Sequence, residues 1–420
     1  MSSENKLSGL TKAEKSWVLY DVANSAFVMI VTATIPIYFR SLAESAGVSA
    51  SNASSIWGTA TSIAILILAL LSPILGAIAD YENMKKRIFT IFFVLGISGG
   101  LLFTFAPTWI SFLAFFIIAR IGYAACNIFY DAMLIDVTTD DRMDKLSTFG
   151  YAFGYIGSCI PFIIGLVLIL FCDSFGLPMI TATRISFLIT LGWWMLLSIP
   201  LYKNVHQVYS VPRETHVVSG AFRRLLETFR KLKKEKSLLF FIIGYFCYID
   251  GVYTIMTMAT TYGGEVGLDS NAMVLALLLT QFVAFPCSIL SGTLAKKVGS
   301  MKMIRIFICM YIAICMFGYG LDTEWEFWVL AVCVGLCQGG IQALSRSYFG
   351  KLIPKESSSE YFGFFDIFGK FADFVGPLLI SASAFFFGNS KYGIVSLIIL
   401  FVIGLILISK SEKAAAGNHS

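Results

Sequence analysis

The sequence predicts an all-α membrane protein with twelve transmembrane helices, arranged as two six-helix halves. Apolar stretches recur along the whole chain, each close to the roughly 20 residues that one helical crossing of a bilayer requires. Hydrophobic residues make up 57% of the 420 residues and charged residues only 14%. A soluble domain could not cover so much apolar surface with so little charge. Lysine and arginine crowd every second gap between the stretches.

The apolar stretches define the expected helices in chain order. We expect spans at 17–39, 53–79, 88–106, 109–135, 147–171, 180–201, 238–261, 271–295, 303–320, 326–349, 361–388 and 392–409. The second, fifth and eleventh spans exceed the minimum length, which predicts tilt or extension into the interface. The first span is too long for a cleaved signal peptide, so we expect it to remain. An even number of spans puts both termini on one side.

The positive charges predict the orientation. If the N-terminus is cytoplasmic and residues near span ends are assigned to the nearer side, 26 of the 31 Lys and Arg are cytoplasmic. Arg40, Arg184 and Lys391 are outside, and Arg120 and Lys370 lie within spans. Loops rich in Lys and Arg face the cytoplasm in polytopic proteins. We therefore predict a multi-pass protein of the cell membrane with both termini in the cytoplasm. The net charge of +5 follows from this topology and does not indicate nucleic-acid binding.

A polar segment divides the spans six and six. The expected units are a cytoplasmic N-terminus (1–16), an N-terminal six-helix bundle (17–201), a basic cytoplasmic linker (202–237), a C-terminal six-helix bundle (238–409) and a cytoplasmic tail (410–420). Helical spacing in the linker places Phe222, Leu225, Leu226, Phe229 and Leu232 on one face, opposite the cations. This pattern indicates a basic amphipathic helix on the cytoplasmic leaflet. A solvated linker and a regulatory protein-binding site are the alternatives.

The two halves share a loop signature. Gly76-Ala-Ile-Ala-Asp80, followed by Lys85 and Lys86, comes after the second span. Gly292-Thr-Leu-Ala-Lys296 comes after the eighth span, with Lys in the place of Asp80. Duplicated six-span halves with a substrate site between them are a common transporter plan.

These residues resemble the loop 2–3 motif of the major facilitator superfamily. Three further segments resemble its vacuole-effluxer-like branch, which comprises autophagy-linked amino-acid effluxers of fungi and plants and many bacterial relatives. They are Tyr20-Asp-Val-Ala-Asn-Ser-Ala-Phe27, Phe129-Tyr-Asp-Ala-Met-Leu134, and the stretch from Gly335 through the Gln-Gly-Gly at 338–340 to Gly363. The resemblance covers nearly the whole chain, and the compact length is similar to that of bacterial members. It implies two pseudo-symmetric bundles that rock around a central cavity lined by spans 1, 4, 7 and 10, with spans 3, 6, 9 and 12 facing lipid.

Ionisable residues inside the spans are the candidate functional residues, because a charge at the bilayer centre is costly unless it faces protein or water. Helical spacing gathers them into polar stripes. The substrate-binding candidates are Asn24, Arg120, Asn127, Asp250, Gln338 and Gln342, and the proton-coupling candidates are Asp250, Asp373, Asp21 and Asp131. The candidates for a cytoplasmic gate or structural motif are Gly76, Asp80, Lys85, Lys86, Gly292, Ser345, Arg346, Asp366 and Lys370.

Depth in the membrane and side-chain chemistry suggest individual roles. The planar fork of Arg120 suits a substrate carboxylate, and burial of Asp250 or Asp373 suits a coupling proton. Each has a structural alternative. Arg120 and Asp250 could pair across the halves, and Lys370 could form an intrahelical ion network with its acidic neighbours. The glutamines could simply hydrogen-bond between helices.

Several patterns typical of enzymes lack their required context. Gly96-Ile-Ser-Gly-Gly100 matches a nucleophile elbow, but it lies in an apolar span and all three His fall in the linker or tail. No Cys-x-x-Cys and no phosphate-binding loop occur, so we predict no metal site, no cofactor and no enzymatic activity.

The sequence thus predicts a secondary active transporter that moves a small polar organic solute by alternating access. We expect proton coupling, and amino acids as substrates follow only from the resemblance. The expected partners are the solute, protons and the lipid bilayer, and a monomer suffices for this architecture. The alternatives are a lipid or drug exporter on the same fold, and a non-transporting membrane receptor or membrane-embedded enzyme.

Overall fold

The computed structural model describes residues 9–212, 217–387 and 391–417, which are almost entirely helical. The helices are α1 (Lys12–Ala33), α2 (Ile35–Ser45), α3 (Ala50–Ala79), α4 (Lys85–Thr104), α5 (Trp109–Val137), α6 (Asp140–Leu170), α7 (Met179–Asn204), α8 (Val217–Lys234), α9 (Lys236–Val266), α10 (Ser270–Val298), α11 (Ser300–Tyr319), α12 (Glu324–Leu352), α13 (Ser358–Phe387) and α14 (Lys391–Gly417). Short 3-10 turns, η2 (Asp173–Phe175) and η3 (Lys355–Ser357), precede α7 and α13.

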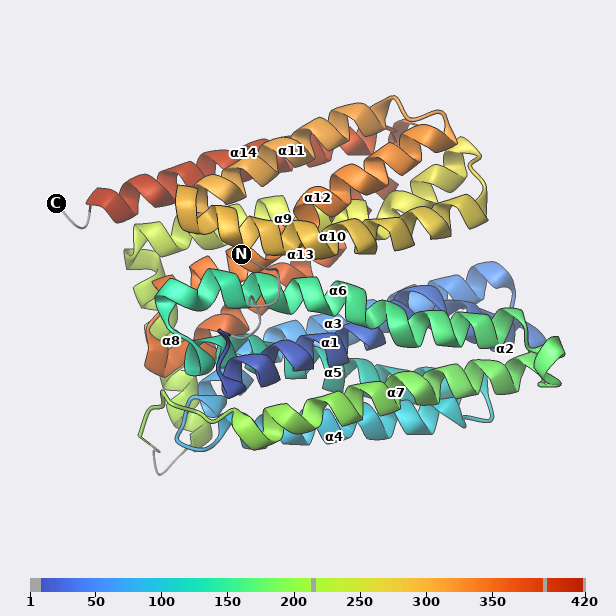
Figure 1. Cartoon of the computed structure of the whole chain (residues 1–420), viewed down its shortest axis with the longest axis horizontal. Coiled ribbons are helices and arrows are strands. Elements are labelled where there is room, and N and C mark those ends of the chain that lie inside the picture. Colours follow the sequence, from blue (N-terminus) through green and yellow to red (C-terminus); the bar gives the residue numbers. More distant parts are fainter. Residues whose placement is uncertain (1–8, 213–216, 388–390, 418–420) are drawn as a thin grey trace.

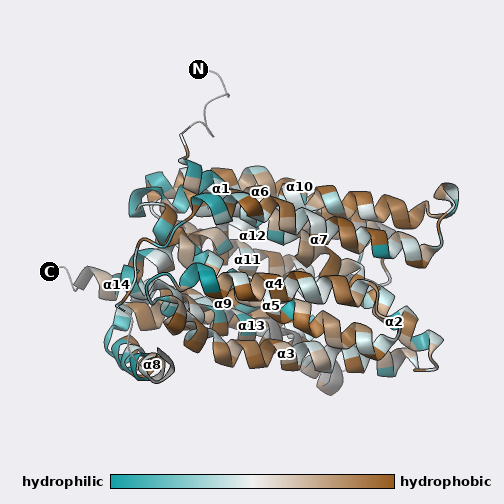
Figure 2. Ribbon diagram, turned by 90° about the horizontal axis from the view of Figure 1, so that it is seen from below, coloured by the Kyte–Doolittle hydropathy of each residue, from teal (hydrophilic) through white to brown (hydrophobic). Residues whose placement is uncertain are grey.

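The long helices form two bundles, α1–α7 and α9–α14, that lie side by side with their helices roughly parallel (Figure 1). The start of α1, the end of α14 and the whole of α8 lie at one end, which we term the α8 end (Figures 1 and 2). The opposite end, which holds α2, we term the α2 end. The bundles are close together at the α8 end and diverge towards the α2 end (Figure 1). Pairs α3 with α13 and α6 with α10 make the main contacts between the bundles.

Among the described residues, eleven helices are long and apolar enough to cross a membrane. The 30-residue α13 lies among them and is the twelfth. Large apolar side chains point outward from the bundles, for example Ile91 on α4, Leu196 on α7, Ile306 on α11 and Ile406 on α14. Apolar surface of this extent requires lipid around it, and the hydrophilic residues gather towards the two ends (Figure 2). The predicted fold class, twelve transmembrane helices in two bundles, is confirmed.

The first predicted span, 17–39, is wrong as a single helix. The chain leaves α1 after Ala33 and starts α2 at Ile35, with Pro36 in the first turn of α2. Proline has no N–H to donate to the preceding turn and fits best at a helix start. The other helices mostly extend beyond the predicted spans at the α8 end, because polar first and last turns there are outside the apolar window.

Candidate functional site

Arg346 lies at the centre of a buried ion cluster between the two bundles near the α8 end. Its guanidinium Nη1 is 2.9 Å from Asp131 Oδ1 on α5, and its Nη2 is 3.5 Å from Asp21 Oδ2 on α1. The same side chain donates to the hydroxyl and to the carbonyl of Ser147 on α6, at 2.9 and 3.1 Å. Only 4% of it is exposed. One arginine of α12 therefore joins three helices of the other bundle.

Aromatic rings enclose the Arg346 cation. Its guanidinium carbon lies 4.7 Å from the ring centre of Trp17, 4.5 Å from that of Tyr151 and 5.6 Å from that of Tyr130. Trp17 stacks on Tyr130 and donates its indole N–H to the carbonyl of that residue at 2.9 Å. Cation–π attraction is larger where water is excluded. The rings therefore stabilise the charge of Arg346 and hold its planar group in place.

Asp80 caps the N-terminus of α13, at the contact between α3 and α13. Its two carboxylate oxygens accept hydrogen bonds from the backbone N–H groups of Ser359 and Glu360, the first turn of α13, at 2.8 and 2.9 Å. A carboxylate at a helix N-terminus satisfies amides that have no partner within the helix and interacts favourably with the helix dipole. Burial nevertheless raises the pKa of Asp80 to about 7, against the opposing effect of Lys85 and the two amides.

Lys85 and Asp136 form a buried ion pair beside this contact, with Nζ 2.7 Å from Oδ2. Lys85 also donates to the Ser358 hydroxyl of α13 at 2.9 Å. Gln207 of the linker accepts from the Lys85 backbone N–H at 3.2 Å. Lys86, in contrast, donates to the Tyr202 carbonyl within its own bundle, its one hydrogen-bond acceptor for the side chain in the described part of the chain. Of the two predicted motif lysines, Lys85 alone reaches the opposite half.

Two glycines bring α3 and α13 into backbone contact. A Cβ at Gly76 would lie 2.1 Å from the Ser359 carbonyl oxygen, and one at Gly363 would lie 2.6 Å from the Ser72 carbonyl oxygen. Neither space tolerates a side chain, because the obstructing atoms belong to the backbone. At Gly292, the counterpart of Gly76 in the second half, an added Cβ would lie 2.2 Å from the Thr148 Oγ1 of α6, so the obstructing atom there belongs to a side chain.

At the contact between α6 and the second half, the acid again comes from the first half. Lys296 occupies the place of Asp80 in the repeat, and Asp144 of α6 serves this interface instead. Asp144 accepts from Lys351 and Ser347 of α12, both at 2.6 Å, and from Ser300 of α11 at 2.7 Å. The two inter-bundle contacts therefore resemble each other in outline while differing in chemistry.

The uncharged candidates lie deeper, towards the α2 end. Asn24 of α1 donates to Asn127 of α5 at 2.9 Å. Gln342 of α12 donates across the bundles to the Tyr155 hydroxyl of α6 at 3.2 Å, and Gln338 donates to Gln281 of α10 at 3.4 Å. These amide contacts therefore link α1 to α5, α12 to α6 and α12 to α10. Ser345, one turn further along, bonds instead to Tyr248 inside its own half.

Arg120 is a partly buried charge within the first bundle. It lies near the middle of α5, half-buried, on the face that carries Asn127 and Asp131. Among the described residues it makes no hydrogen bond and no ion pair, and the suggested pairing with Asp250 does not form. Further along the polar stripes, Thr32 on α1 and Thr257 on α9 are exposed. An unpaired guanidinium at this depth requires water or a ligand beside it.

Asp250 does not line a cavity between the two halves. It is fully buried within the second half and accepts the backbone N–H of Gly376 of α13 at 2.8 Å. The reason is that α13 packs directly on this face of α9. Asp366 contacts Lys370 one turn on and accepts from the Ser72 hydroxyl of α3 at 2.7 Å, so it joins the bundles as well. The side chain of Asp373 lies outside the described residues.

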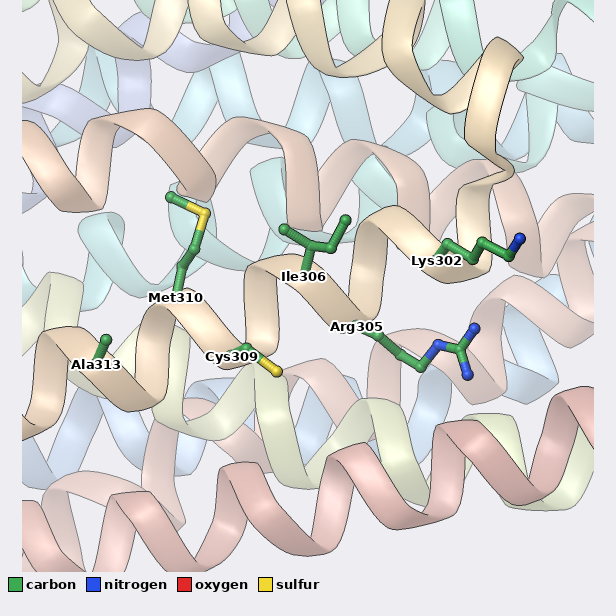
Figure 3. Close-up of a pocket in the computed structure, with 6 residues that line it drawn as sticks. All are labelled: Lys302, Arg305, Ile306, Cys309, Met310 and Ala313. Carbon is green, nitrogen blue, oxygen red and sulfur yellow. The ribbon is translucent and has the colours of Figure 1, made fainter.

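A surface groove lies away from these groups. It has a volume of about 610 Å³ and lies on α11, lined by Lys302, Arg305, Ile306, Cys309, Met310 and Ala313 (Figure 3). Arg305 there pairs with Glu412 of α14 at 3.0 Å. This shallow, mostly apolar groove faces away from the inter-bundle contacts, on one of the helices that the sequence predicts to face lipid.

Several residues of the α8-end contact escaped the sequence analysis. They are Asp136, Asp144, Ser147, Lys351, Ser358, Ser359, Glu360 and Arg224. Most of them lie near helix ends or in the linker. Charged residues are common there because they are not buried in the membrane, so the sequence alone does not single them out. Glu360 and the neighbouring Gly363 do fall inside the segment on which the resemblance rests, which is the one signal that could have found them.

Twelve crossing helices in two bundles define a membrane protein with the major facilitator fold. Solved structures with this fold include FucP in an outward conformation, at a TM-score of 0.73 and 13% identity over 95% of this chain and 97% of that one. A bacterial homologue of the iron transporter ferroportin in an outward-facing state also matches, at 0.68 and 12% over 96% and 98%. Identities this low establish the fold alone.

The sequence comparisons identify the family. The model of the family described as vacuole effluxer Atg22-like matches residues 50–142 and 135–416. The chain belongs to this family. It is 45% identical to the uncharacterized MFS-type transporter YxiO of Bacillus subtilis over 404 residues, covering 95% of this chain and 94% of YxiO. It is 26% identical to autophagy-related protein 22 of Yarrowia lipolytica over 302 residues, 64% of this chain and 51% of that protein. The chain is therefore a multi-pass membrane transporter, and its resemblance to the vacuole-effluxer-like branch is confirmed.

Proposed function

We propose that the protein is a proton-coupled secondary transporter of small solutes that carry a carboxylate, with amino acids as the favoured class. The observation that carries the proposal is Arg120, an arginine inside a membrane helix with no partner among the described residues. A planar fork of donors recognises a carboxylate by two parallel hydrogen bonds. The preference for amino acids follows only from the resemblance to the vacuole-effluxer-like branch.

The orientation belongs to the same proposal. Lys and Arg gather at the α8 end, so that end faces the cytoplasm of a cell membrane, with both termini there. The contacts of Arg346 and Asp80 then close the cytoplasmic side, and the bundles diverge towards the outside (Figure 1). Arg120 lies between the closed side and the diverging side, where a substrate site near the membrane midplane is expected.

The ion cluster supplies a mechanism for coupling. Asp131 and Asp21 attract Arg346 only while they are ionised, so protonation of either weakens the contact that joins α12 to the first half. Arrival of a proton from outside would then loosen the cytoplasmic side. Asp250 and Asp373 remain the second pair of candidates for the coupling proton. Rocking of the bundles about the central site would complete the cycle.

Counterflow into liposomes with labelled amino acids and other carboxylates tests the proposal. We expect accumulation of at least one carboxylate by the wild type and none by Arg120→Gln. The absence of accumulation for every carboxylate would overturn the substrate class. For coupling, Asp131→Asn, Asp250→Asn and Asp373→Asn are compared in uptake driven by a pH gradient and in exchange. We expect at least one variant to lose the first and keep the second, whereas full pH dependence in all three would contradict our assignment.

A further inference from the structure

The linker helix α8 has two different long faces. One face packs against α3 and α9 and contains the buried residues Ala221, Thr228 and Leu232. On another face Leu226 is 63% exposed and Phe229 is 52% exposed. The apolar residues that the sequence grouped on one face are thus divided, with Leu232 inward and these two outward. The side chain of Phe222 lies outside the described residues.

The exposed apolar pair has cations on both sides along the helix. Arg223, Arg230 and Lys233 are exposed, and the Lys233 ammonium lies 5.5 Å from the centre of the Phe229 ring. The helix runs across the ends of the other helices, lengthwise in Figure 1 and seen nearly end-on at the edge of the molecule in Figure 2. An amphipathic helix that runs across the ends of the membrane-crossing helices lies in the plane of the interface.

The buried face of α8 touches the inter-bundle contact itself. Arg224 donates to Glu360 of α13 at 3.0 Å and to the Ala77 carbonyl of α3 at 3.3 Å, and its Nη2 is 3.7 Å from Asp80. Its guanidinium also lies 5.2 Å from the centre of the Tyr81 ring. Arg224 therefore pairs with acids from both halves at the point where Asp80 caps α13. A change in the position of α8 necessarily alters this contact.

We propose that α8 binds the anionic surface of the membrane through Leu226, Phe229 and the adjacent cations, and that this binding stabilises the form closed at the α8 end. Anionic headgroups attract the cations while the two apolar side chains enter the acyl boundary. Held there, α8 keeps Arg224 on Asp80 and Glu360. The inference rests on the proposed function, in which contact at the α8 end closes the cytoplasmic side. The lipid contact of α8 and the contact of Asp80 with α13 can nevertheless both be measured without a transport assay.

The lipid contact is tested with the photo-crosslinking residue benzoylphenylalanine. The full-length protein carries it at position 226, at 229 or, as the matched control, at the neighbouring exposed polar position Glu227. Each variant is placed in nanodiscs of phosphatidylcholine alone or with phosphatidylglycerol. We expect phospholipid adducts at 226 and 229 that increase about fivefold with the anionic lipid, the factor that one basic side chain contributes at such a surface, and little adduct at 227. Equal labelling at all three positions, adducts to a second copy of the protein, or no effect of the anionic lipid would overturn the proposed surface.

The closed contact is followed by hydrogen–deuterium exchange of the peptide that contains Ser359 and Glu360, whose amides bond to Asp80. We expect slower exchange in discs with phosphatidylglycerol than in discs without it. Leu226→Asp with Phe229→Asp should abolish the difference, and Glu227→Gln should retain it. Arg224→Gln should keep the lipid adducts of the crosslinking variants but lose the slower exchange. Exchange that ignores lipid composition in the wild type would overturn the link between α8 and closure, whether or not the protein transports amino acids.

Discussion

Arg346 and Asp131 form an ion pair of 2.9 Å between α12 and α5, in a cluster that also holds Asp21 and Ser147. The two residues are 215 positions apart in the chain and belong to different halves. Arg346 is only 4% exposed and Asp131 27% exposed, so the buried arginine depends on its acidic partners for its solvation. The ion pair can therefore form only while the two halves are in contact at the α8 end.

Arg346→Gln should destabilise the protein by about 3–5 kcal/mol, because it leaves buried acids without their cation. Asp131→Asn should cost less, since Asp21 still faces the arginine. A double-mutant cycle on thermal unfolding in detergent checks the pair. We expect the double variant to be more stable than the sum of the single effects predicts. Additive effects would show that the two side chains do not interact energetically.

Arg120→Gln should abolish transport of a carboxylate solute without lowering the thermal stability of the protein. The arginine has no partner among the described residues, so its removal breaks no ion pair. Thermal shift with the transported solute provides the measurement, because a ligand that binds only the folded state raises its stability. The shift should vanish in Arg120→Gln and be reduced in Arg120→Lys, which keeps the charge but loses the planar fork. A large loss of stability without solute would indicate a structural role for Arg120.

Asp80 should make stability depend on pH. Burial raises its pKa from the ordinary 3.8 to about 7. A raised pKa means that the folded form holds the proton more tightly than the unfolded chain, so this contribution to the free energy of unfolding is fully present below about pH 4 and is lost as the pH rises to about 7. Thermal unfolding of wild type and Asp80→Asn across that interval gives the measurement. We expect the difference between the two to change with pH, and a constant offset would contradict the raised pKa.

Gly76→Ala should disfavour the closed form, because the added Cβ would meet the Ser359 carbonyl at 2.1 Å. Overpacking of this kind typically costs about 1–3 kcal/mol. Gly58 lies on the same helix with nothing within 4 Å of an added Cβ, so Gly58→Ala is the matched control. Hydrogen exchange at the first turn of α13 should become faster in Gly76→Ala and stay unchanged in Gly58→Ala. Equal exchange in both variants would mean that the helices can separate here at no cost.

The sequence predicts the fold well because the bilayer imposes long apolar helices whose number and order can be read directly. The exception at Thr34, where α1 gives way to α2, depends on Pro36, which lies inside an otherwise unbroken apolar stretch. The resemblance likewise predicts the family. Neither source of information distinguishes a kinked span from a straight one.

The candidate site is only partly accessible to the same reasoning. A charge within a span is conspicuous, so Arg120, Arg346 and Asp131 could be found from sequence. Which of them meet could not, because the partners come from helices far apart in the chain. Asp250 illustrates the limit, since its polar stripe predicts a cavity and the packing of α13 covers it. The contacts of Asp136 and Asp144 escaped because charges at helix ends carry no penalty in the interface.

The start of the linker has a consequence for how the protein is made. Val211 bonds to the backbone of Asp80 and Glu82, and Gln207, Val208 and Tyr209 bond around Lys85 and Asp136. Residues that follow the final membrane helix of the first half therefore complete the hydrogen bonding of that half. A nascent chain cannot complete that half until the ribosome has passed this segment. A fragment truncated after α7 would keep the pair of Lys85 and Asp136 but lack the linker groups that bond to the Lys85 amide and to Asp136.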